Sequence, residues 1–285
     1  MAEFGISITP DDPASALALA RAADAAGLDL IGIQDHAYNP GFLDTMTLIA
    51  HLGALTERVR FVPDVADLAL RPAAMLAKAA ATLDVLTGGR FDLGVGAGAF
   101  PDAIAGMGGP PWRGAAAVAA TAESLQVLRA ALDARGPVAL NGEHLRLAGY
   151  RPGPSPTRRV PVWVGAQGPR LLGVVGELAD GWVSPLNIYV PPADVPSKQS
   201  AIDEAAQRAG RDPSSVRRMY NVLGTIDGAS RHGLSDSAAT WARMLADWSA
   251  GLRFDTFIFW PVHDELDQVR RFAEDVVPRV RELLA

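Results

Sequence analysis

The segment LDLIGIQDHAYN, from Leu28 to Asn39, ends an apolar run with an acid and an imidazole side by side. Its first half is typical of a buried β-strand, so Asp35 and His36 follow the strand's end. Histidine is the side chain best suited to donate or accept a proton near neutral pH. We expect His36 to be a general acid/base that Asp35 orients. The alternative is a pair that only satisfies polar groups at the end of a strand.

Another acid follows a second apolar segment, VRFVPDV, at residues 59–65. Asp64 and Val65 stand at its end. Asp64 is a candidate functional acid, and an ordinary turn at the end of a strand also explains it. No pair of His or His/Asp residues has the helical spacing of a metal site, so we expect no metal.

Two glycine-rich segments suit a ligand as well. GVGAGAF, residues 94–100, either makes room for a flat ligand or allows close packing, and it lacks the last glycine of a dinucleotide fingerprint. GAQGPR, residues 165–170, lies between a predicted strand and a predicted helix. Its backbone N–H groups and the helix N-terminus could bind an anion, with Arg170 adding a positive charge. An ordinary glycine-rich loop is the alternative.

Short strands and helices alternate along the whole chain of 285 residues. The apolar runs predict strands at residues 4–9, 28–34, 59–65, 90–98, 160–165, 179–185, 216–225 and 254–260. Helices are predicted at residues 11–26, 42–55, 72–86, 114–134, 169–178, 191–209, 235–250 and 264–285. Eight such units favour an α/β fold of the (β/α)8 TIM barrel type, with an open, doubly wound sheet as the alternative.

One segment departs from this repeat. Residues 138–147 predict a β-hairpin, because Asn141-Gly142 suits a type I′ turn. We therefore expect a single domain over residues 1–285, with a helix and hairpin excursion at about 100–158, between the fourth and fifth strands. In barrels of this kind the functional groups gather at the C-terminal ends of the strands. The four loops above should then meet at one end.

The composition excludes several classes of function. The net charge is −6 and the basic residues are scattered, so we expect no nucleic-acid partner. The densest basic pairs, Arg158-Arg159 and Arg217-Arg218, precede predicted strands. The chain has no cysteine, which excludes disulfides and cysteine metal sites and fits a cytoplasmic protein. No secretory signal or membrane-spanning run is evident, so we expect no membrane partner.

Taken together, these segments resemble the bacterial luciferase-like family of flavin- and deazaflavin-dependent oxidoreductases. The resemblance covers most of the chain. It rests on DHAYNP after the second strand, on LALRPAAMLAKAAATLDVLTGGRFDLGVGAG at residues 68–98, on LNGEHLRL, and on PVWVGAQGPRLL with ELADGW. The long stretch at residues 68–98 is the most specific of these. The family fold is a TIM barrel with an excursion near its middle.

The resemblance also implies roles for particular residues. The cofactor, FMN or the deazaflavin coenzyme F-420, would lie at the C-terminal mouth. Its phosphate would be held by the loop of Gly165, Ala166, Gln167, Gly168 and Pro169. Asp64-Val65 matches a position where the family often has a non-prolyl cis peptide that backs the ring. Ala97 and Gly98 would lie beside the cofactor.

The Asp-His pair and GAQGP resemble the deazaflavin branch of the family, in which the His assists proton movement. The resemblance therefore implies a coenzyme F-420-dependent oxidoreductase that transfers a hydride between the deazaflavin and a small organic substrate. Sugar-phosphate dehydrogenases of this branch carry a Glu where this chain has Ala99, and a Trp where it has Asn39-Pro40. These differences argue against a glucose-6-phosphate substrate.

Two other functions remain open. One is an FMN-dependent luciferase-like monooxygenase, whose ring would react with oxygen. The other is a non-catalytic flavin-binding barrel, which would have no need for His36 beside the ring. Family members are often dimers, so the resemblance also implies a homodimer.

Overall fold

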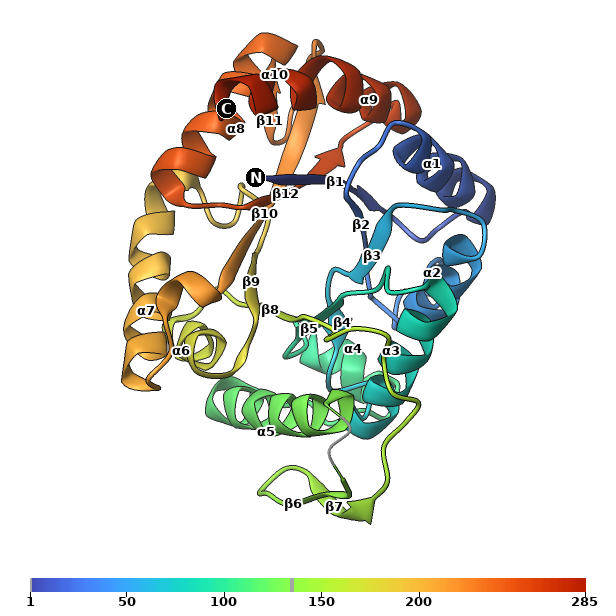
Figure 1. Cartoon of the computed structure of the whole chain (residues 1–285), viewed down its shortest axis with the longest axis vertical. Helices are drawn as coiled ribbons and strands as arrows, with labels where there is room; N and C mark the ends of the chain where they lie inside the picture. The colour runs from blue at the N-terminus through green and yellow to red at the C-terminus, as the bar shows by residue number, and fades with distance from the viewer. Residues whose placement is uncertain (1, 134–135) are drawn as a thin grey trace.

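A parallel β-sheet curls into a barrel with helices around its outside (Figure 1). The computed structural model describes residues 2–133 and 136–285. The strands are β1 (Glu3–Ile8), β2 (Leu30–Ile33), β3 (Arg60–Pro63), β4 (Ala66–Asp67), β5 (Leu93–Gly96), β6 (Val138–Asn141), β7 (Arg146–Tyr150), β8 (Val162–Gly165), β9 (Gly181–Ser184), β10 (Arg217–Ile226), β11 (Leu234–Asp236) and β12 (Thr256–Pro261).

The helices mostly follow the strands in alternation, as the sequence predicts. They are α1 (Pro13–Ala25), α2 (Thr45–Gly53), α3 (Ala73–Thr87), α4 (Pro101–Gly106), α5 (Gly114–Leu132), α6 (Pro169–Leu178), α7 (Val195–Arg208), α8 (Ala238–Leu252), α9 (Glu265–Arg271) and α10 (Val277–Leu283). Short turns of other helix types are η1 (Pro192–Asp194), η2 (Pro213–Ser215) and η3 (Phe272–Val276).

The order of the strands shows that the sheet is nearly closed. Neighbouring strands pair in the order β3-β2-β1-β12-β10-β9-β8-β5-β4, and the pairs along this path are parallel. β4 follows β3 directly along the chain, and a parallel bridge joins Phe61 to Phe91 across the remaining gap. The structure confirms the predicted TIM barrel and excludes the open, doubly wound sheet.

The barrel strands are buried on both faces, which explains their continuous apolar runs. Side chains that alternate along each strand enter two separate clusters. One fills the barrel interior and consists of Leu30, Val62, Trp163, Val183, Met219 and Ile258. The larger cluster lies between the sheet and the helices, and it includes Trp182. Trp163 and Trp182 are therefore both core residues, on opposite faces of the sheet.

The predicted excursion is only partly outside the repeat. Helix α5 packs between α3 and α6 in the outer ring, so it serves as the helix that follows β5. The end predicted for it at residue 134 lies outside the described residues. The hairpin of β6 and β7 projects from the ring beside α5 (Figure 1). Residues 235 and 236, predicted as the start of a helix, instead belong to β11, which pairs with β10.

The hairpin is confirmed, but the predicted type I′ turn is wrong. Asn141 pairs with Arg146, so the loop between them has four residues, 142–145, instead of two. The carboxylate of Glu123 on α5 accepts hydrogen bonds from the backbone N–H groups of Glu143, His144 and Leu145 at 2.7–3.0 Å. Desolvation would raise the pKa of Glu123, but these three bonds outweigh it and hold the pKa below its usual value. A distant carboxylate therefore shapes this loop.

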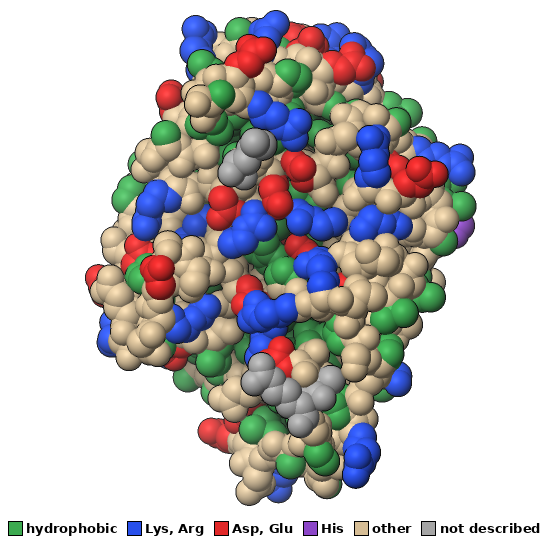
Figure 2. All heavy atoms as spheres, in the orientation of Figure 1, with side chains coloured by type: hydrophobic (Ala, Val, Ile, Leu, Met, Phe, Trp, Pro, Cys, Tyr) green, Lys and Arg blue, Asp and Glu red, His purple; other side chains and the backbone are tan. Residues whose placement is uncertain are grey.

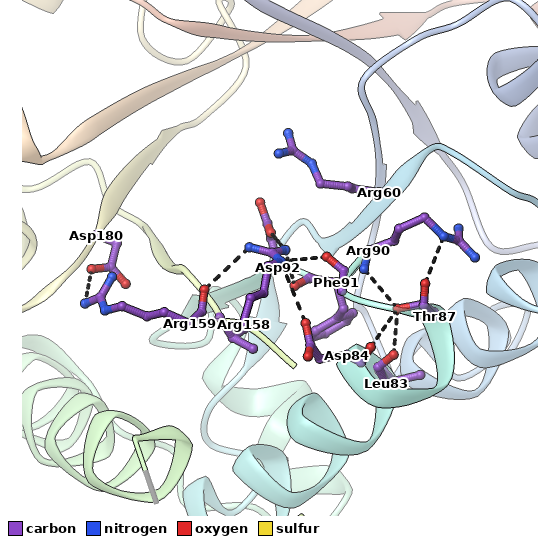
Figure 3. Close-up of polar contacts among 12 residues, drawn as sticks. Arg60, Leu83, Asp84, Thr87, Arg90, Phe91, Asp92, Arg158, Arg159 and Asp180 are labelled. Carbon is purple, nitrogen blue, oxygen red and sulfur yellow. Dashed lines mark hydrogen bonds and ion pairs between the residues drawn. The ribbon is translucent and has the colours of Figure 1, made fainter. Parts of the chain in front are cut away.

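Charged residues cluster where the strands begin. Figure 2 shows Lys and Arg side chains interspersed with Asp and Glu across the middle of the face seen in Figure 1. Arg158 bonds Asp92 at 2.5 Å, and Arg159 bonds Asp180 at 2.7 Å (Figure 3). Arg217 bonds Asp255 at 2.8 Å in the same way. The basic pairs that precede predicted strands are thus structural partners at the N-terminal end of the barrel.

No helix within residues 2–133 and 136–285 has both the length and the apolar character that crossing a bilayer requires.

Candidate active site

His36 lies half-buried at the C-terminal end of β2, in a small aromatic cluster. Its Nδ1 atom is 2.7 Å from the hydroxyl of Tyr38, so the two side chains share a hydrogen bond. The exposed ring of Phe100, from the loop after β5, meets His36 edge-on with the ring centres 5.9 Å apart, and it meets Tyr38 at 5.7 Å. The imidazole is therefore held from one side, and its Nε2 atom has no hydrogen-bond partner among the described residues.

Tyr38 keeps its proton over the physiological range. Desolvation, together with the carboxylates of Asp67 and Asp35, raises the pKa of Tyr38 to about 12. A phenol hydroxyl can both donate and accept, so it can bond either neutral tautomer of His36. That freedom suits a histidine that must act as an acid in one direction of a reaction and as a base in the other.

The expectation that Asp35 orients His36 is wrong. The buried carboxylate of Asp35 accepts two hydrogen bonds from Arg71, from Nε to Oδ2 and from Nη2 to Oδ1, both at 2.7 Å. It also accepts the backbone N–H of Asp67 at 3.0 Å. Arg71 also donates a hydrogen bond to one carboxylate oxygen of Asp44. The other oxygen of Asp44 caps the N-terminus of α2. Asp35 therefore ties its loop to the start of α3, and Tyr38 takes the place beside His36.

Val65 connects three of the loops that the sequence singled out. The peptide bond between Asp64 and Val65 is cis, as the resemblance predicted. The Val65 side chain then lies against Gly96 and Gly165, which pair with each other on β5 and β8. A Cβ added to Gly96 would lie 2.7 Å from Val65 Cγ2, and one added to Gly165 would lie 3.0 Å from it. A side chain at Gly96 would therefore force Val65 to move, and one at Gly165 would be tightly packed against it.

The Asp64 side chain turns toward the barrel interior. Its Oδ1 atom accepts a hydrogen bond of 3.3 Å from Nδ2 of Asn221 on β10, and the Asn221 oxygen accepts one of 2.9 Å from Trp260 on β12. Its Oδ2 atom is buried without a partner among the described residues. Desolvation raises the pKa of Asp64 to about 6, and the Asn221 bond limits the rise. The mouth thus contains a carboxyl group that gains a proton in mildly acidic solution.

The loop after β8 leads directly into α6. Gly168 is the N-cap and Pro169 the first residue of that helix, and no side chain of the described residues caps its first N–H groups. The Nζ atom of Lys198, on α7, lies 3.1 Å from the backbone oxygen of Gln167. Ala166 is buried, and its own oxygen accepts a bond from Trp182. An exposed helix N-terminus therefore lies beside an ammonium group, an arrangement that attracts anions.

The structure brings the four predicted loops to one end of the barrel. Tyr38, Arg71 and Lys198 lie beside them and were missed. Tyr38 follows His36 by two residues, which is a signal that the sequence contained. The sequence contained no such signal for Arg71 or Lys198, because their partners are far away along the chain. That Ala97, Gly98 and residues 165–169 bind a cofactor stays a prediction. Among the described residues, no group of three or more His, Asp or Glu side chains could hold a metal ion.

Comparisons with known proteins agree with this fold. The sequence profile of the family described as luciferase-like monooxygenase matches residues 2–277. The 5,10-methylenetetrahydromethanopterin reductase of Methanolobus tindarius is 32% identical over 216 residues, which are 75% of this chain. The aligned region is 62% of that relative's length, so the chain spans less than two thirds of it.

Solved structures show the same fold at low sequence identity. The coenzyme F-420-dependent tetrahydromethanopterin reductase of Methanopyrus kandleri superposes with a TM-score of 0.79 at 21% identity, covering 98% of this chain and 99% of that one. The oxygenating component of 3,6-diketocamphane monooxygenase from Pseudomonas putida, solved with FMN, has a TM-score of 0.74 at 18% identity, again covering 98% and 99%. The neighbours thus include users of both cofactors.

Proposed function

The chain belongs to the luciferase-like monooxygenase family, and from that premise we propose that it is a coenzyme F-420-dependent oxidoreductase acting on a small organic substrate. The observation that carries this proposal is His36 at the barrel mouth, held by Tyr38 at 2.7 Å, with no hydrogen-bond partner for Nε2 among the described residues. A group that binds a proton at a defined atom suits hydride transfer to or from an alcohol or a carbonyl. When bound, the deazaflavin supplies the carbon that exchanges the hydride.

The residues present fit a flat, phosphate-bearing cofactor. The uncapped start of α6 and the nearby Lys198 suit the phosphate. The bulge at Val65 between two glycines offers a surface against which a ring can lie. The buried Oδ2 atom of Asp64, which has no hydrogen-bond partner among the described residues, offers a hydrogen-bonding group in the same region. These groups come from three different loops of one barrel end, as a ligand spanning that end requires.

The protein's own contribution to such a reaction is proton transfer and positioning. His36 takes the proton from a substrate hydroxyl as the hydride leaves the adjoining carbon, and it returns that proton in the reverse direction. Tyr38 keeps the imidazole in place by its hydrogen bond. Phe100, which is exposed and lies edge-on to both rings, packs against them at the mouth of the barrel. The Asp35–Arg71 pair fixes the loop that carries them.

An FMN-dependent monooxygenase is the second candidate, favoured by the similarity to a solved monooxygenase that contains FMN. The two candidates differ in the ring that they bind and in its reaction with oxygen. We expect the purified protein to bind coenzyme F-420 more tightly than FMN, measured by quenching of each cofactor's fluorescence, and to reduce it without consuming oxygen when a suitable alcohol is present. Tighter binding of FMN, with oxygen uptake by the reduced complex, would overturn this assignment in favour of the monooxygenase.

The role of Lys198 can be tested separately from the choice of ring. Changing Lys198→Met should weaken the binding of FMN or coenzyme F-420 by roughly tenfold, the equivalent of about 1.4 kcal/mol, because one charge-assisted contact to phosphate is lost. Riboflavin has no phosphate, so its affinity should not change. Arg208→Met removes the same charge from the exposed far end of α7 and is the control. Equal losses for riboflavin and FMN would show that Lys198 does not contact the phosphate.

A further inference from the structure

Two buried oxygens on the inner face of the barrel have no hydrogen-bond partner among the described residues: Oδ2 of Asp64 and Oγ of Ser7. Ser7, on β1, is only 5% exposed. Buried polar groups are nearly always hydrogen-bonded, because leaving one unpaired costs about 1–3 kcal/mol. Two such atoms in one region therefore point to a partner that binds there.

Gly32 brings the two oxygens to the same part of the barrel. It lies on β2, between β1 and β3, and it pairs directly with Ser7. The Asp64 carboxyl lies over Gly32, because a Cβ added there would be 3.2 Å from Oδ2. Below Gly32 is Ile258, which belongs to the apolar interior of the barrel. Asp64 and Ser7 thus form a polar layer on top of an apolar plug, and we call these two residues the polar floor.

We propose that the polar floor recognises the edge of a bound heterocycle on which N–H and C=O groups alternate, and that Asp64 carries a proton when the ring is bound. This inference rests on the proposed function and concerns the same site. A protonated carboxyl offers an O–H donor beside a carbonyl acceptor, which matches an adjacent C=O and N–H on a lactam or imide. The Ser7 hydroxyl can donate or accept and so complements either group.

The surroundings of Asp64 favour the neutral acid. Three neighbouring strands present Gly32, Ile258 and Asn221 to it, none of which titrates. The titratable groups of the adjoining loops include His36, Tyr38, Asp67 and the Asp35 carboxylate that is already paired with Arg71. The pKa of Asp64 is raised to about 6 by desolvation. A ring acceptor that takes a hydrogen bond from the carboxyl O–H would favour the neutral acid and raise that pKa further.

This gives a defined sign for the pH dependence of binding. A group whose pKa is higher in the complex than in the free protein takes up a proton on binding. Affinity is then greatest below the free protein's pKa, about 6, and falls as the pH rises through the pKa of the complex. We expect ring affinity to be roughly fivefold weaker at pH 8 than at pH 6, the effect that linkage gives for a pKa rise of about one unit.

The test uses riboflavin and 5-deazariboflavin, which lack the phosphate and its own titration. Binding is followed by fluorescence quenching between pH 5 and 8, and proton uptake by calorimetry in two buffers of different ionisation enthalpy. Wild-type protein should show net proton uptake on binding at pH 7, by a fraction of a proton. Asp64→Asn, which mimics the neutral acid in shape, should bind with an affinity independent of pH and without proton uptake. Ser7→Ala should bind more weakly and keep the pH dependence.

Asp67→Asn is the matched control, because Asp67 is a second carboxyl of the same segment with a raised pKa, for which desolvation is the main cause. It should leave the proton uptake unchanged. A pH-independent affinity in the wild type, or proton release on binding, would overturn the inference while leaving the proposed function intact. If neither riboflavin nor 5-deazariboflavin bound the wild type at any pH, the inference and the proposed function would both be overturned.

Discussion

Replacing His36 with Ala is expected to lower turnover by about 10²- to 10⁴-fold, the usual contribution of a general acid/base, while the affinity for the cofactor stays nearly the same. The reason is geometric. His36 lies at the rim with its Nδ1 atom bonded to Tyr38, and its loop is fixed by Asp35 and Arg71 instead of by the imidazole itself. Removing the ring should therefore not move the loop. Steady-state rates and cofactor titrations on the same preparations check this.

Tyr38→Phe provides the graded comparison for this experiment. It removes only the hydroxyl that bonds His36 and keeps the aromatic packing against Phe100. We expect a loss of roughly tenfold, smaller than that of His36→Ala, because the general base survives but is less well oriented. If His36→Ala retained wild-type turnover, the proton would have to move through another group. A wild type that binds the ring and turns over none of a panel of alcohols and carbonyls would favour the flavin-binding barrel.

Arg158→Ala is expected to lower the free energy of unfolding by about 3 kcal/mol or more, as breaking a buried ion pair does when one charge is left behind. Asp92 is only 2% exposed, and Arg158 bonds it at 2.5 Å. Without Arg158, the Asp92 carboxylate would remain buried with no ion pair within 4 Å among the described residues, and only the more distant charge of Arg60 would act on it. The same guanidinium also bonds the backbone oxygens of Gly89 and Phe91, so its loss loosens the chain before β5.

The neighbouring residue supplies the matched control. Arg159 is 60% exposed, and its partner Asp180 keeps a second arginine, Arg129. Arg159→Ala should therefore cost only about 0–1 kcal/mol. Thermal and urea unfolding of the two variants should differ clearly, with Arg158→Ala melting roughly 5 °C or more below Arg159→Ala. Equal effects would show that burial of Asp92 does not determine the energy of this pair.

The barrel was predictable because its signals are local and repeated. Apolar strands, helix starts such as Asp12-Pro13 and the break at Gly27 occur within a few residues of the element that they define, and the structure has all three features. The hairpin turn was mispredicted for the opposite reason. Asn141-Gly142 favours a two-residue turn by itself, but Glu123, about twenty residues earlier, binds three N–H groups of a longer loop.

The candidate site was predictable to a similar extent. The ends of the strands placed Asp35, His36 and Asp64 at one rim, because all barrel strands run in the same direction. The partner of each side chain was not predictable. Asp35 and His36 are adjacent in sequence, yet their side chains have different partners. Asp35 bonds Arg71, and His36 bonds Tyr38. Adjacent residues project in different directions when a strand gives way to a loop, and only the fold determines what each one meets.

The arrangement of Asp35, Arg71 and Asp44 affects how the site meets a ligand. Arg71 joins a carboxylate in the loop after β2 to the residue that caps α2, immediately before α3 begins. The segment that carries His36 is thus anchored to two helices of the scaffold. Ordering a loop on ligand capture ordinarily consumes part of the binding energy. Here that entropy is already lost when the chain folds, so a ligand arriving at the rim meets a preorganised imidazole.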